Sequence, residues 1–420
     1  MDRGKDDTGG KVLKQIADLH IHSRYSMATS KDGTPEMLDL WARKKGITLL
    51  GTGDMTHPIW RQELKEKLIP AEQGLFRLKD EYVLPEAARY PGKAPRFVLS
   101  GEISSIYKKG GKTRKVHSLI LLPGFDEADA FAARLEKIGN IHSDGRPILG
   151  LPCHDLLEMM LEISEEGIYI PAHIWTPHFS LLGAKSGFDS IEQCFEELTP
   201  YIHALETGLS SDPAMNWKIS ALDHCQLVSN SDAHSPSRLG REASLLDTEL
   251  SYRGLFQAVQ EGEGLKGTIE FFPEEGKYHY DGHRKCGICL SPGEAEALGG
   301  ICPVCGKQLT MGVDHRVEQL SDREEPDMPE RGRPYESLVP LAEVISECMG
   351  YSTAGKKVQA QYERLLNSLG AEFDILRNVP EEDIRREGGT LLGESISRLR
   401  AGDVIRQPGF DGEYGKIRFF

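Results

Sequence analysis

The chain has 420 residues, too many for one typical hydrophobic core, so two or three domains are expected. Its 39% hydrophobic and 27% charged residues are typical of a soluble globular protein, and its apolar runs are too short to span a membrane. The net charge of −15 argues against a largely basic surface, although a local basic patch can still bind nucleic acid. Met1 to Lys14 is polar and contains no signal-peptide core, which predicts a disordered leader on a cytoplasmic protein.

Between residue 15 and about residue 270, short β-rich runs alternate with helical patterns. Strands are expected at 16–20, 48–51, 96–101, 117–122, 148–151, 167–172, 204–207 and 226–230. Such alternation is typical of parallel strands joined by right-handed crossovers. About eight strands in this length favour a closed or nearly closed α/β barrel, in which the active site lies at the C-terminal ends of the strands.

The first apolar run ends in Asp18-Leu19-His20-Ile21-His22. Two histidines at positions i and i+2 of a strand point to the same side, so one metal ion could bind both, although this spacing alone is a weak signal. Other His, Asp and Glu residues stand at the ends or edges of the following apolar runs: Asp54, His57, Glu102, His117, His173, Asp232 and His234. Packing does not explain this pattern, which predicts a metal site at the barrel mouth.

Imidazoles and carboxylates together favour zinc, manganese or iron over magnesium alone, and the residues suffice for two or three ions. Glu102 and Asp232 are candidates to bridge two ions, because a carboxylate has two oxygens to share. Clustered divalent metals suit the hydrolysis of phosphate esters, since one activates water while the others neutralise developing charge. Because histidine binds metal only when neutral, activity is expected to fall below the imidazole pH range.

Four of the eight cysteines form two Cys-x2-Cys pairs separated by twelve residues: Cys286, Cys289, Cys302 and Cys305. This spacing predicts a tetrahedral four-cysteine zinc site, and a site with no open position is structural. A pair of disulfides is the alternative, which a reducing compartment disfavours. We therefore expect a barrel domain at 15–272, a zinc module at 273–320, and a mainly helical region at 321–420 that begins with a charged, proline-rich connection.

The His-x-His run, Gly51-Thr52-Gly53-Asp54, the glutamate after the third strand and Ser231-Asp232-Ala233-His234 resemble the PHP superfamily of metal-dependent phosphoesterases. The resemblance implies a distorted (β/α)7 barrel with up to three metals at its mouth. By motif, the first metal would be held by His20, His22, Glu102 and Asp232, the second by Glu102, His117 and His173, and a third by Asp54 or His57 with His234. Glu102, Asp232 and His234 are the expected catalytic residues.

The order of barrel, four-cysteine module and helical region, with the runs at 170–177 and 206–213, resembles the endonuclease Q family over almost the whole chain. That family nicks DNA on the 5′ side of deaminated bases (uracil, hypoxanthine, xanthine) and abasic sites, by attack of metal-bound hydroxide that leaves a 3′-hydroxyl. A replication clamp is a partner such an enzyme could use, but no clamp-binding peptide stands out. The alternatives are a phosphatase acting on a small phosphorylated substrate and a binding protein with an inactive barrel.

Candidate substrate contacts follow from residue type and position. Trp175 could stack on a base, or pack within its loop. Glu206 could line a lesion pocket or support a ligand, and Arg238 and Arg241 could contact phosphates or be ordinary surface arginines. The remaining candidates are Ser210, in the 206–213 run, and Lys112 and Arg114, near a predicted hairpin tip.

Overall fold

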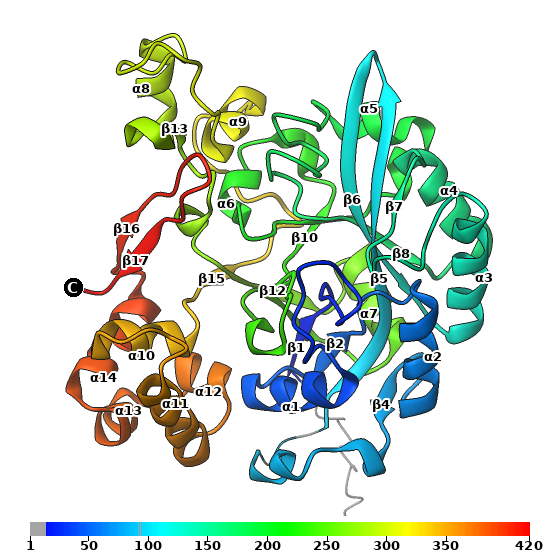
Figure 1. The fold of residues 1–420 in the computed structure, drawn as a ribbon, viewed down its shortest axis with the longest axis vertical. Helices are drawn as coiled ribbons and strands as arrows, with labels where there is room; N and C mark the ends of the chain where they lie inside the picture. Colours follow the sequence, from blue (N-terminus) through cyan, green and yellow to red (C-terminus); the bar gives the residue numbers. More distant parts are fainter. Residues whose placement is uncertain (1–13, 91, 93) are drawn as a thin grey trace, which may run out of the picture.

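The computed structural model describes residues 14–90, 92 and 94–420, so the predicted leader lies outside the described residues except for its last position. Figure 1 shows a barrel domain at the right, a small cysteine-rich module at the upper left and a group of helices at the lower left. The final hairpin, in red, runs between the module and these helices. No helix in the described part of the chain has the length and apolar character needed to cross a membrane.

The barrel is built on one large mixed sheet. Its strands are β1 (Lys14–Asp18), β2 (Leu49–Gly51), β3 (Leu68–Pro70), β4 (Phe76–Leu78), β5 (Arg96–Lys109), β6 (Lys112–Leu122), β7 (Ile148–Leu149), β8 (Ile168–Pro171), β11 (Ala243–Asp247), β12 (Leu265–Glu270) and β15 (Tyr335–Ser337). β1, β2 and β5 are parallel neighbours, and β9 (Ala204–Glu206) pairs in parallel with β10 (Gln226–Val228) as a separate sheet. The α/β barrel predicted from the alternating pattern is therefore present, and strand ends meet at one mouth.

The pairing of β5 and β6 differs from the expected parallel arrangement. These strands form a long antiparallel hairpin that projects from the barrel (Figure 1). Gly110 and Gly111 form its tip with φ of 60° and 75°, a left-handed conformation that suits a two-residue turn. Parallel strands need a long crossover, and two residues cannot supply one. The hairpin tip predicted from the basic run around residue 112 is present.

Helices cover the outside of the barrel (Figure 1). They are α1 (Pro35–Lys45), α2 (Pro58–Lys67), α3 (Phe125–Glu136), α4 (Cys153–Ile163), α5 (Ile191–Phe195), α6 (Pro213–Asn216) and α7 (Tyr252–Gln260). α1 illustrates the local signals: the Thr34 hydroxyl accepts a hydrogen bond from Met37 N, Pro35 occupies the first turn, and Gly46 ends the helix with φ of 86°. One core cluster joins buried strand residues, including Val98, Ile170 and Val228, to Leu255 and Val259 of α7.

Two buried carboxyl groups lie inside the barrel, Glu270 at the end of β12 and Glu242 just before β11. Glu270 and Glu242 are both fully buried; Oε2 of Glu270 accepts hydrogen bonds from Thr207 and Ser229, both at 3.0 Å, and Oε1 of Glu242 accepts one from Phe271 N at 3.1 Å. Burial raises the pKa of Glu270 to about 8, and burial with the neighbouring Glu270 raises the pKa of Glu242 well above its usual range. The folded state therefore binds more protons than the unfolded state between about pH 4.5 and 8, so this pair lowers stability as pH rises through that window.

We expect Glu270→Gln to raise the Tm at pH 8.5 by several degrees relative to the unmodified protein, with a much smaller gain at pH 5. The amide removes the cost of burying a charge and keeps the shape of the side chain. Thermal unfolding of both proteins across this pH range measures the difference. The exposed Glu263→Gln is the matched control, and an equal gain at both pH values would contradict the role of the buried carboxyl.

The predicted four-cysteine module follows the barrel. It contains β13 (Asp281–His283), β14 (Ile288–Leu290), α8 (Pro292–Ala297) and α9 (Val313–Leu320). β13 and β14 form a short antiparallel hairpin, and Ala295, Cys302 and Leu309 form a small core of their own. A core of this size is too small to hold a fold alone, which fits stabilisation by a metal ion.

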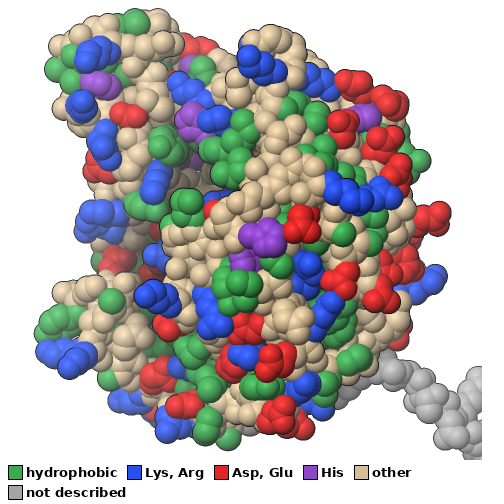
Figure 2. Space-filling view, turned by 45° about the vertical axis from the view of Figure 1, so that its right-hand side comes forward, with side chains coloured by type: hydrophobic (Ala, Val, Ile, Leu, Met, Phe, Trp, Pro, Cys, Tyr) green, Lys and Arg blue, Asp and Glu red, His purple; other side chains and the backbone are tan. Residues whose placement is uncertain are grey.

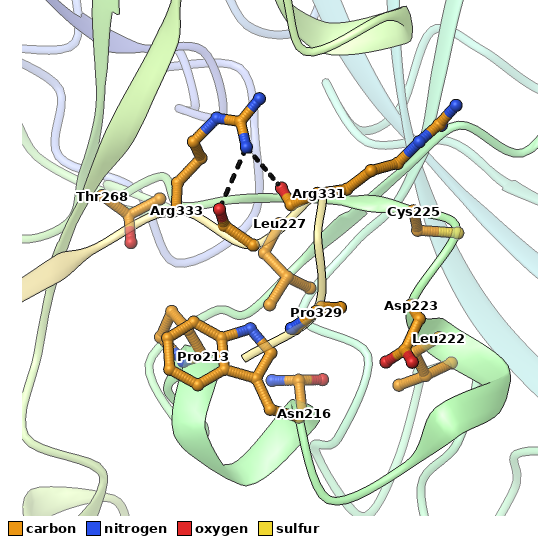
Figure 3. Close-up of a pocket in the computed structure, with 12 residues that line it drawn as sticks. Pro213, Asn216, Leu222, Asp223, Cys225, Leu227, Thr268, Pro329, Arg331 and Arg333 are labelled. Atoms are coloured by element: carbon orange, nitrogen blue, oxygen red, sulfur yellow. Dashed lines mark hydrogen bonds between the residues drawn. The ribbon is translucent and has the colours of Figure 1, made fainter. Parts of the chain in front are cut away.

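The connection after α9 lies against the barrel instead of hanging free. Arg323 forms an ion pair with Asp223 at 2.6 Å, and Arg331 donates a hydrogen bond to the carbonyl of His224. Figure 3 shows Arg333 donating to the carbonyl oxygens of Arg331 and Gly332 beside a small pocket at this junction. None of the residues that line this pocket is a predicted metal ligand, so it belongs to the junction and not to the metal centre.

The C-terminal region is helical, as predicted, and docks on α1. Its elements are α10 (Leu341–Met349), α11 (Lys356–Leu369), α12 (Glu372–Arg377), α13 (Glu381–Gly388), α14 (Thr390–Ala401), β16 (Ile405–Gln407) and β17 (Lys416–Arg418). Lys45 of α1 forms an almost fully buried ion pair with Glu372 at 2.7 Å. Next to the final hairpin, Gly409 N donates to the Glu274 carbonyl, and Tyr280 N donates to the Gly409 carbonyl. The end of the chain is thereby joined to the segment that leads into the cysteine-rich module.

Candidate metal centre

The predicted ligands converge at the barrel mouth in two groups. The first ligand group consists of His20, His22, Glu102 and Asp232, and the second of Glu102, His117 and His173. Within each group the ligand atoms lie within 4.8 Å of one another. These residues follow or lie in β1, β5, β6, β8 and β10, so strands that are distant in sequence supply one site.

Glu102 belongs to both groups, and each of its oxygens faces one of them. Oε2 lies 3.2 Å from His22 Nε2, in the first ligand group. Oε1 lies 2.6 Å from His117 Nδ1 and 3.2 Å from His173 Nε2, in the second ligand group. A carboxylate held in this way can offer one oxygen to each of two metal ions.

The ring nitrogens in the first ligand group fit a metal ion. His20 Nε2 is buried and makes no hydrogen bond, yet it lies 3.5 Å from Glu102 and 3.7 Å from Asp232. An unpaired buried nitrogen is costly unless something accepts its lone pair. A divalent cation placed among this nitrogen and the two carboxylates would do so, and would also balance their charge.

Two further carboxylates hold the histidines of the first ligand group from behind. Glu206 lies 3.0 Å from His20 Nδ1, and Asp54 lies 3.0 Å from His22 Nδ1. Each contact keeps the proton on Nδ1 and leaves Nε2 free to bind metal. Glu206 is fully buried and also accepts from His173 N, so it supports ligands and does not line a lesion pocket, which was one of its two expected roles.

The electrostatics match this arrangement. Burial alone would raise the pKa of Glu102, but His117, His20 and Arg146 hold it well below its usual range. Burial lowers the pKa of His117 to about 4, so this imidazole is neutral near pH 7, as a metal ligand must be. Burial opposes the charged form of His20 as well, but Glu206 and Glu102 outweigh it and raise its pKa well above the usual range. The site thus has an excess of negative charge suited to cations.

The backbone of the site contains three non-glycine residues with positive φ and two glycines that lie against a neighbouring strand end. Asp54, His173 and Asp232 adopt positive φ of 48°, 30° and 46°, a region that non-glycine residues rarely occupy and that is characteristic of functional sites. A Cβ at Gly51 or at Gly53 would lie 2.1 Å from Leu19 O or 2.3 Å from Ile21 O. This close approach explains the two glycines of the Gly51–Asp54 run, which place Asp54 directly behind His22.

The predicted third group is not assembled among the described residues. His57 caps α2 by accepting from Trp60 N at 3.4 Å, and its Nε2 lies 3.0 Å from the His142 carbonyl, so both ring nitrogens are engaged by the backbone. Asp54 supports His22 instead of binding metal on its own. His234 is partly exposed, donates from Nδ1 to the Asp232 carbonyl at 2.8 Å, and packs on the His22 ring. The structure therefore shows two ligand groups, with His234 at their edge.

The residues predicted to contact substrate differ in whether the structure leaves their side chains exposed. Trp175 is 0% exposed, and its indole donates to Asn216, so it packs inside the protein and cannot stack on a base. Arg241 pairs with Glu343 at 3.3 Å and lies over the Phe271 ring. Among the remaining candidates, Ser210 is buried, Arg114 lies over the Phe188 ring and bonds to the Gly187 carbonyl, and Lys112 and Arg238 are exposed.

Sequence reasoning missed Arg146, whose Nη1 lies 3.1 Å from Glu102 Oε2. It lies in the loop before β7, in no recognisable motif. β7 pairs in parallel with β5, with Ile148 opposite Ser104. Extending this register by two residues places Arg146 opposite Glu102. Its side chain is 22% exposed, so a guanidinium reaches the metal ligands while remaining accessible to an anionic substrate.

Of the predicted zinc ligands in the module, the structure brings three cysteines together. Cys286, Cys302 and Cys305 form a group with His283, and their ligand atoms lie within 4.8 Å of one another. Cys289 is not in this group. All eight cysteines of the chain are free thiols, so the disulfide alternative is not what the structure contains.

Two ligand groups that share a carboxylate, with an arginine beside them at the mouth of a distorted α/β barrel, are the arrangement that hydrolyses phosphate esters. One ion can activate water while a second ion and a guanidinium neutralise the charge that develops on phosphorus oxygens. The fold and site define a PHP-type metal-dependent phosphoesterase.

Comparisons narrow this class. The crystal structure of a lesion-specific endonuclease from Pyrococcus furiosus superposes with a TM-score of 0.84 at 31% identity, covering 97% of this chain and 95% of that one. Endonuclease Q in complex with a 27-mer duplex carrying an abasic lesion at the active site superposes at 0.83, also at 31% identity, covering 97% and 96%. The chain belongs to the endonuclease Q family, and it is a hydrolytic nuclease.

The two sequence relatives match this chain over different shares of their own length. The uncharacterised Bacillus subtilis protein YqxK is 30% identical over 97% of this chain and 100% of its own length. The uncharacterised protein MJ0043 of Methanocaldococcus jannaschii is 31% identical over 64% of this chain, but the match spans only 35% of that longer protein. A family profile described as the MJ0043 C-terminal domain matches residues 340–403, which contain α10 to α14.

Proposed function

We propose that this protein is a metal-dependent DNA repair endonuclease that nicks the phosphodiester on the 5′ side of deaminated bases and abasic sites. The observation that carries the proposal is Glu102, which joins two ligand groups at the mouth of a barrel. The family supports the substrate class, because one of the matching structures is described as a lesion-specific endonuclease and the other as endonuclease Q in complex with an abasic duplex. Uracil, hypoxanthine and xanthine are the deaminated bases we propose.

The metal centre would hold zinc or manganese, the ions that mixed imidazole and carboxylate ligands favour, with magnesium as a weaker alternative. When bound, these ions supply an activated water and neutralise phosphate charge. The chain's own residues do the positioning: Glu206 and Asp54 fix the rings of His20 and His22, and Arg146 offers a guanidinium to a phosphate oxygen. His234 keeps its proton on Nδ1, so Nε2 is available at the edge of the site to take up or deliver a proton.

The first experiment is cleavage of end-labelled duplexes that carry one uracil, one hypoxanthine, one abasic site or no lesion, with Mn2+ or Mg2+ and with an EDTA control. A single metal-dependent cut just 5′ of each lesion, absent from the undamaged duplex, is the expected result. No cut on any duplex, together with turnover of a generic phosphomonoester, would replace this proposal with the small-molecule phosphatase.

The DNA would contact the barrel mouth, the cysteine-rich module and the helical region at 321–420. Figure 2 shows Lys and Arg side chains toward the left, over the module and the C-terminal region, whereas Asp and Glu gather along the right-hand edge. This separation lets a chain with a net charge of −15 still offer basic side chains to a phosphate backbone. The exposed Lys112, on the projecting hairpin, is one such side chain.

Affinity for an abasic duplex is expected to fall linearly with salt on a log–log plot, because phosphate contacts release counterions. Lys112→Gln should reduce the slope by about 0.9, the value for one lost contact. Fluorescence anisotropy with EDTA-treated protein at several salt concentrations measures this slope. Lys137 is an exposed lysine at the end of α3, and Lys137→Gln should leave the slope unchanged. Equal slopes for the unmodified protein and both variants would show that Lys112 does not contact a DNA phosphate.

We place the enzyme in the cytoplasm, where a reducing environment keeps cysteines as free thiols and available to zinc. The replication clamp considered as a partner has no support among the described residues.

A further inference from the structure

The cysteine-rich module places a histidine among three of its cysteines. His283 Nδ1 lies 3.5 Å from Cys305 Sγ, and Cys286 Sγ lies within 4.8 Å of this pair and of Cys302 Sγ. These four side chains form one cluster. We propose that His283, Cys286, Cys302 and Cys305 bind the zinc ion and that Cys289 does not.

The register of the β13–β14 hairpin explains why Cys289 is excluded. Gly282 pairs with Cys289, and His283 pairs with Ile288. Cross-strand partners point to the same face of a sheet, and successive residues point to opposite faces. His283 and Cys289 therefore lie on opposite faces of this hairpin, and a single tetrahedral ion cannot bind both.

The face on which Cys289 lies is already occupied. A Cβ at Gly282, on that same face, would lie 2.5 Å from the Phe410 ring. Burial and the nearby Glu294 and Glu413 raise the pKa of the Cys289 thiol. None of the causes of this shift is another cysteine. Cys289 therefore packs toward the final segment of the chain, away from Cys302 and Cys305.

Bringing Cys289 to the zinc would require a shift of the hairpin by one residue. Gly282 is held in its present register by two hydrogen bonds to Thr310, from Gly282 N at 3.0 Å and from Thr310 N at 2.8 Å. A shift would break both bonds and turn His283 away from Cys305. The second cysteine of the first Cys-x2-Cys pair is thus a packing residue, and the histidine three positions before that pair takes its place.

The two ligand sets differ in charge. Zinc with four thiolates carries a net charge of −2, whereas three thiolates and a neutral imidazole give −1. A less negative zinc site suits a module that faces a DNA backbone.

Cobalt substitution tests the proposal, because thiolate-to-cobalt charge-transfer absorption counts the thiolates bound. The described ligands of the barrel site are imidazoles and carboxylates, which give no thiolate-to-cobalt band. In the full-length protein this absorption therefore comes only from cobalt bound in the module. Cys289→Ser should keep the charge-transfer intensity and the module's resistance to chelators. His283→Cys should raise the intensity by roughly one third, from three thiolates to four. Cys302→Ser is the positive control and should lower it.

His283→Ala should release cobalt at a lower chelator concentration than Cys289→Ser does. If His283→Ala impairs folding, the comparison of Cys289→Ser with His283→Cys still decides the question. Loss of about a quarter of the intensity in Cys289→Ser, with no gain in His283→Cys, would overturn the proposal and restore a four-cysteine site.

Discussion

Glu102→Gln should lower lesion-dependent cleavage by on the order of a thousandfold or more, because the residue shared by both ligand groups loses its negative charge and one of its two ligand oxygens. The amide keeps the size of the side chain but replaces one oxygen with an N–H donor, which repels a cation. No single replacement of His22 or His173 would disturb both groups. We therefore expect this variant to lose more activity than a change to any other ligand.

Single-turnover cleavage of an abasic duplex measures the loss, and metal content after gel filtration shows whether ions are released. The exposed Glu158→Gln, on α4, is the matched control and should cleave normally. Cleavage within tenfold of the unmodified protein, with metal content unchanged, would show that Glu102 bridges nothing.

Arg146→Ala should reduce the cleavage rate by about 10- to 100-fold while metal content stays the same. The guanidinium lies 3.1 Å from Glu102, close enough to reach a phosphate beside the ions. Arg146→Lys should recover only part of the rate, because an ammonium cannot bind phosphate in the bidentate way. The loss should fall mainly on kcat, since the interaction strengthens as charge develops on the phosphate.

An alternative role for Arg146 is that of a counter-ion that only stabilises Glu102. In that case the alanine variant would bind less metal, and added Mn2+ would restore its rate. The exposed Arg253→Ala, on α7, controls for the loss of a positive charge elsewhere and should leave the rate unchanged.

The sequence predicted the features that depend on local order. His20 and His22 just after β1 and His173 just after β8 are predictable because a strand end fixes where a side chain emerges, and the helical C-terminal region is predictable because its periodicity is local. Glu102, expected after a strand that ends at residue 101, lies inside β5 instead. The alternation of elements does not predict the antiparallel pairing of β5 and β6, because it does not by itself distinguish a hairpin from a crossover. The basic run around residue 112 does predict the hairpin tip.

Other features depend on partners that are distant along the chain. Trp175 can be buried because Asn216 Oδ1 accepts a hydrogen bond from its indole N–H, and Arg146 reaches Glu102 because β7 pairs with β5. Asp54 and Glu206 stand behind histidines instead of beside the ions, a distinction that only the three-dimensional arrangement gives. The sequence spacing identifies the His, Asp and Glu residues of the site, but it does not say which of them lie next to the metal ions and which support a ligand from behind.

The hydrogen bonds of Gly409 to Glu274 and Tyr280 have a consequence for how the protein is made. The ribosome delivers the barrel and the cysteine-rich module long before it delivers the segment that Gly409 belongs to. Until that segment emerges, Tyr280 N, next to β13, lacks the Gly409 carbonyl as its acceptor, and the zinc-binding hairpin lacks the ring of Phe410. The module therefore reaches its final form only near the end of synthesis, so a prematurely terminated chain would carry a complete metal centre beside an unfinished module.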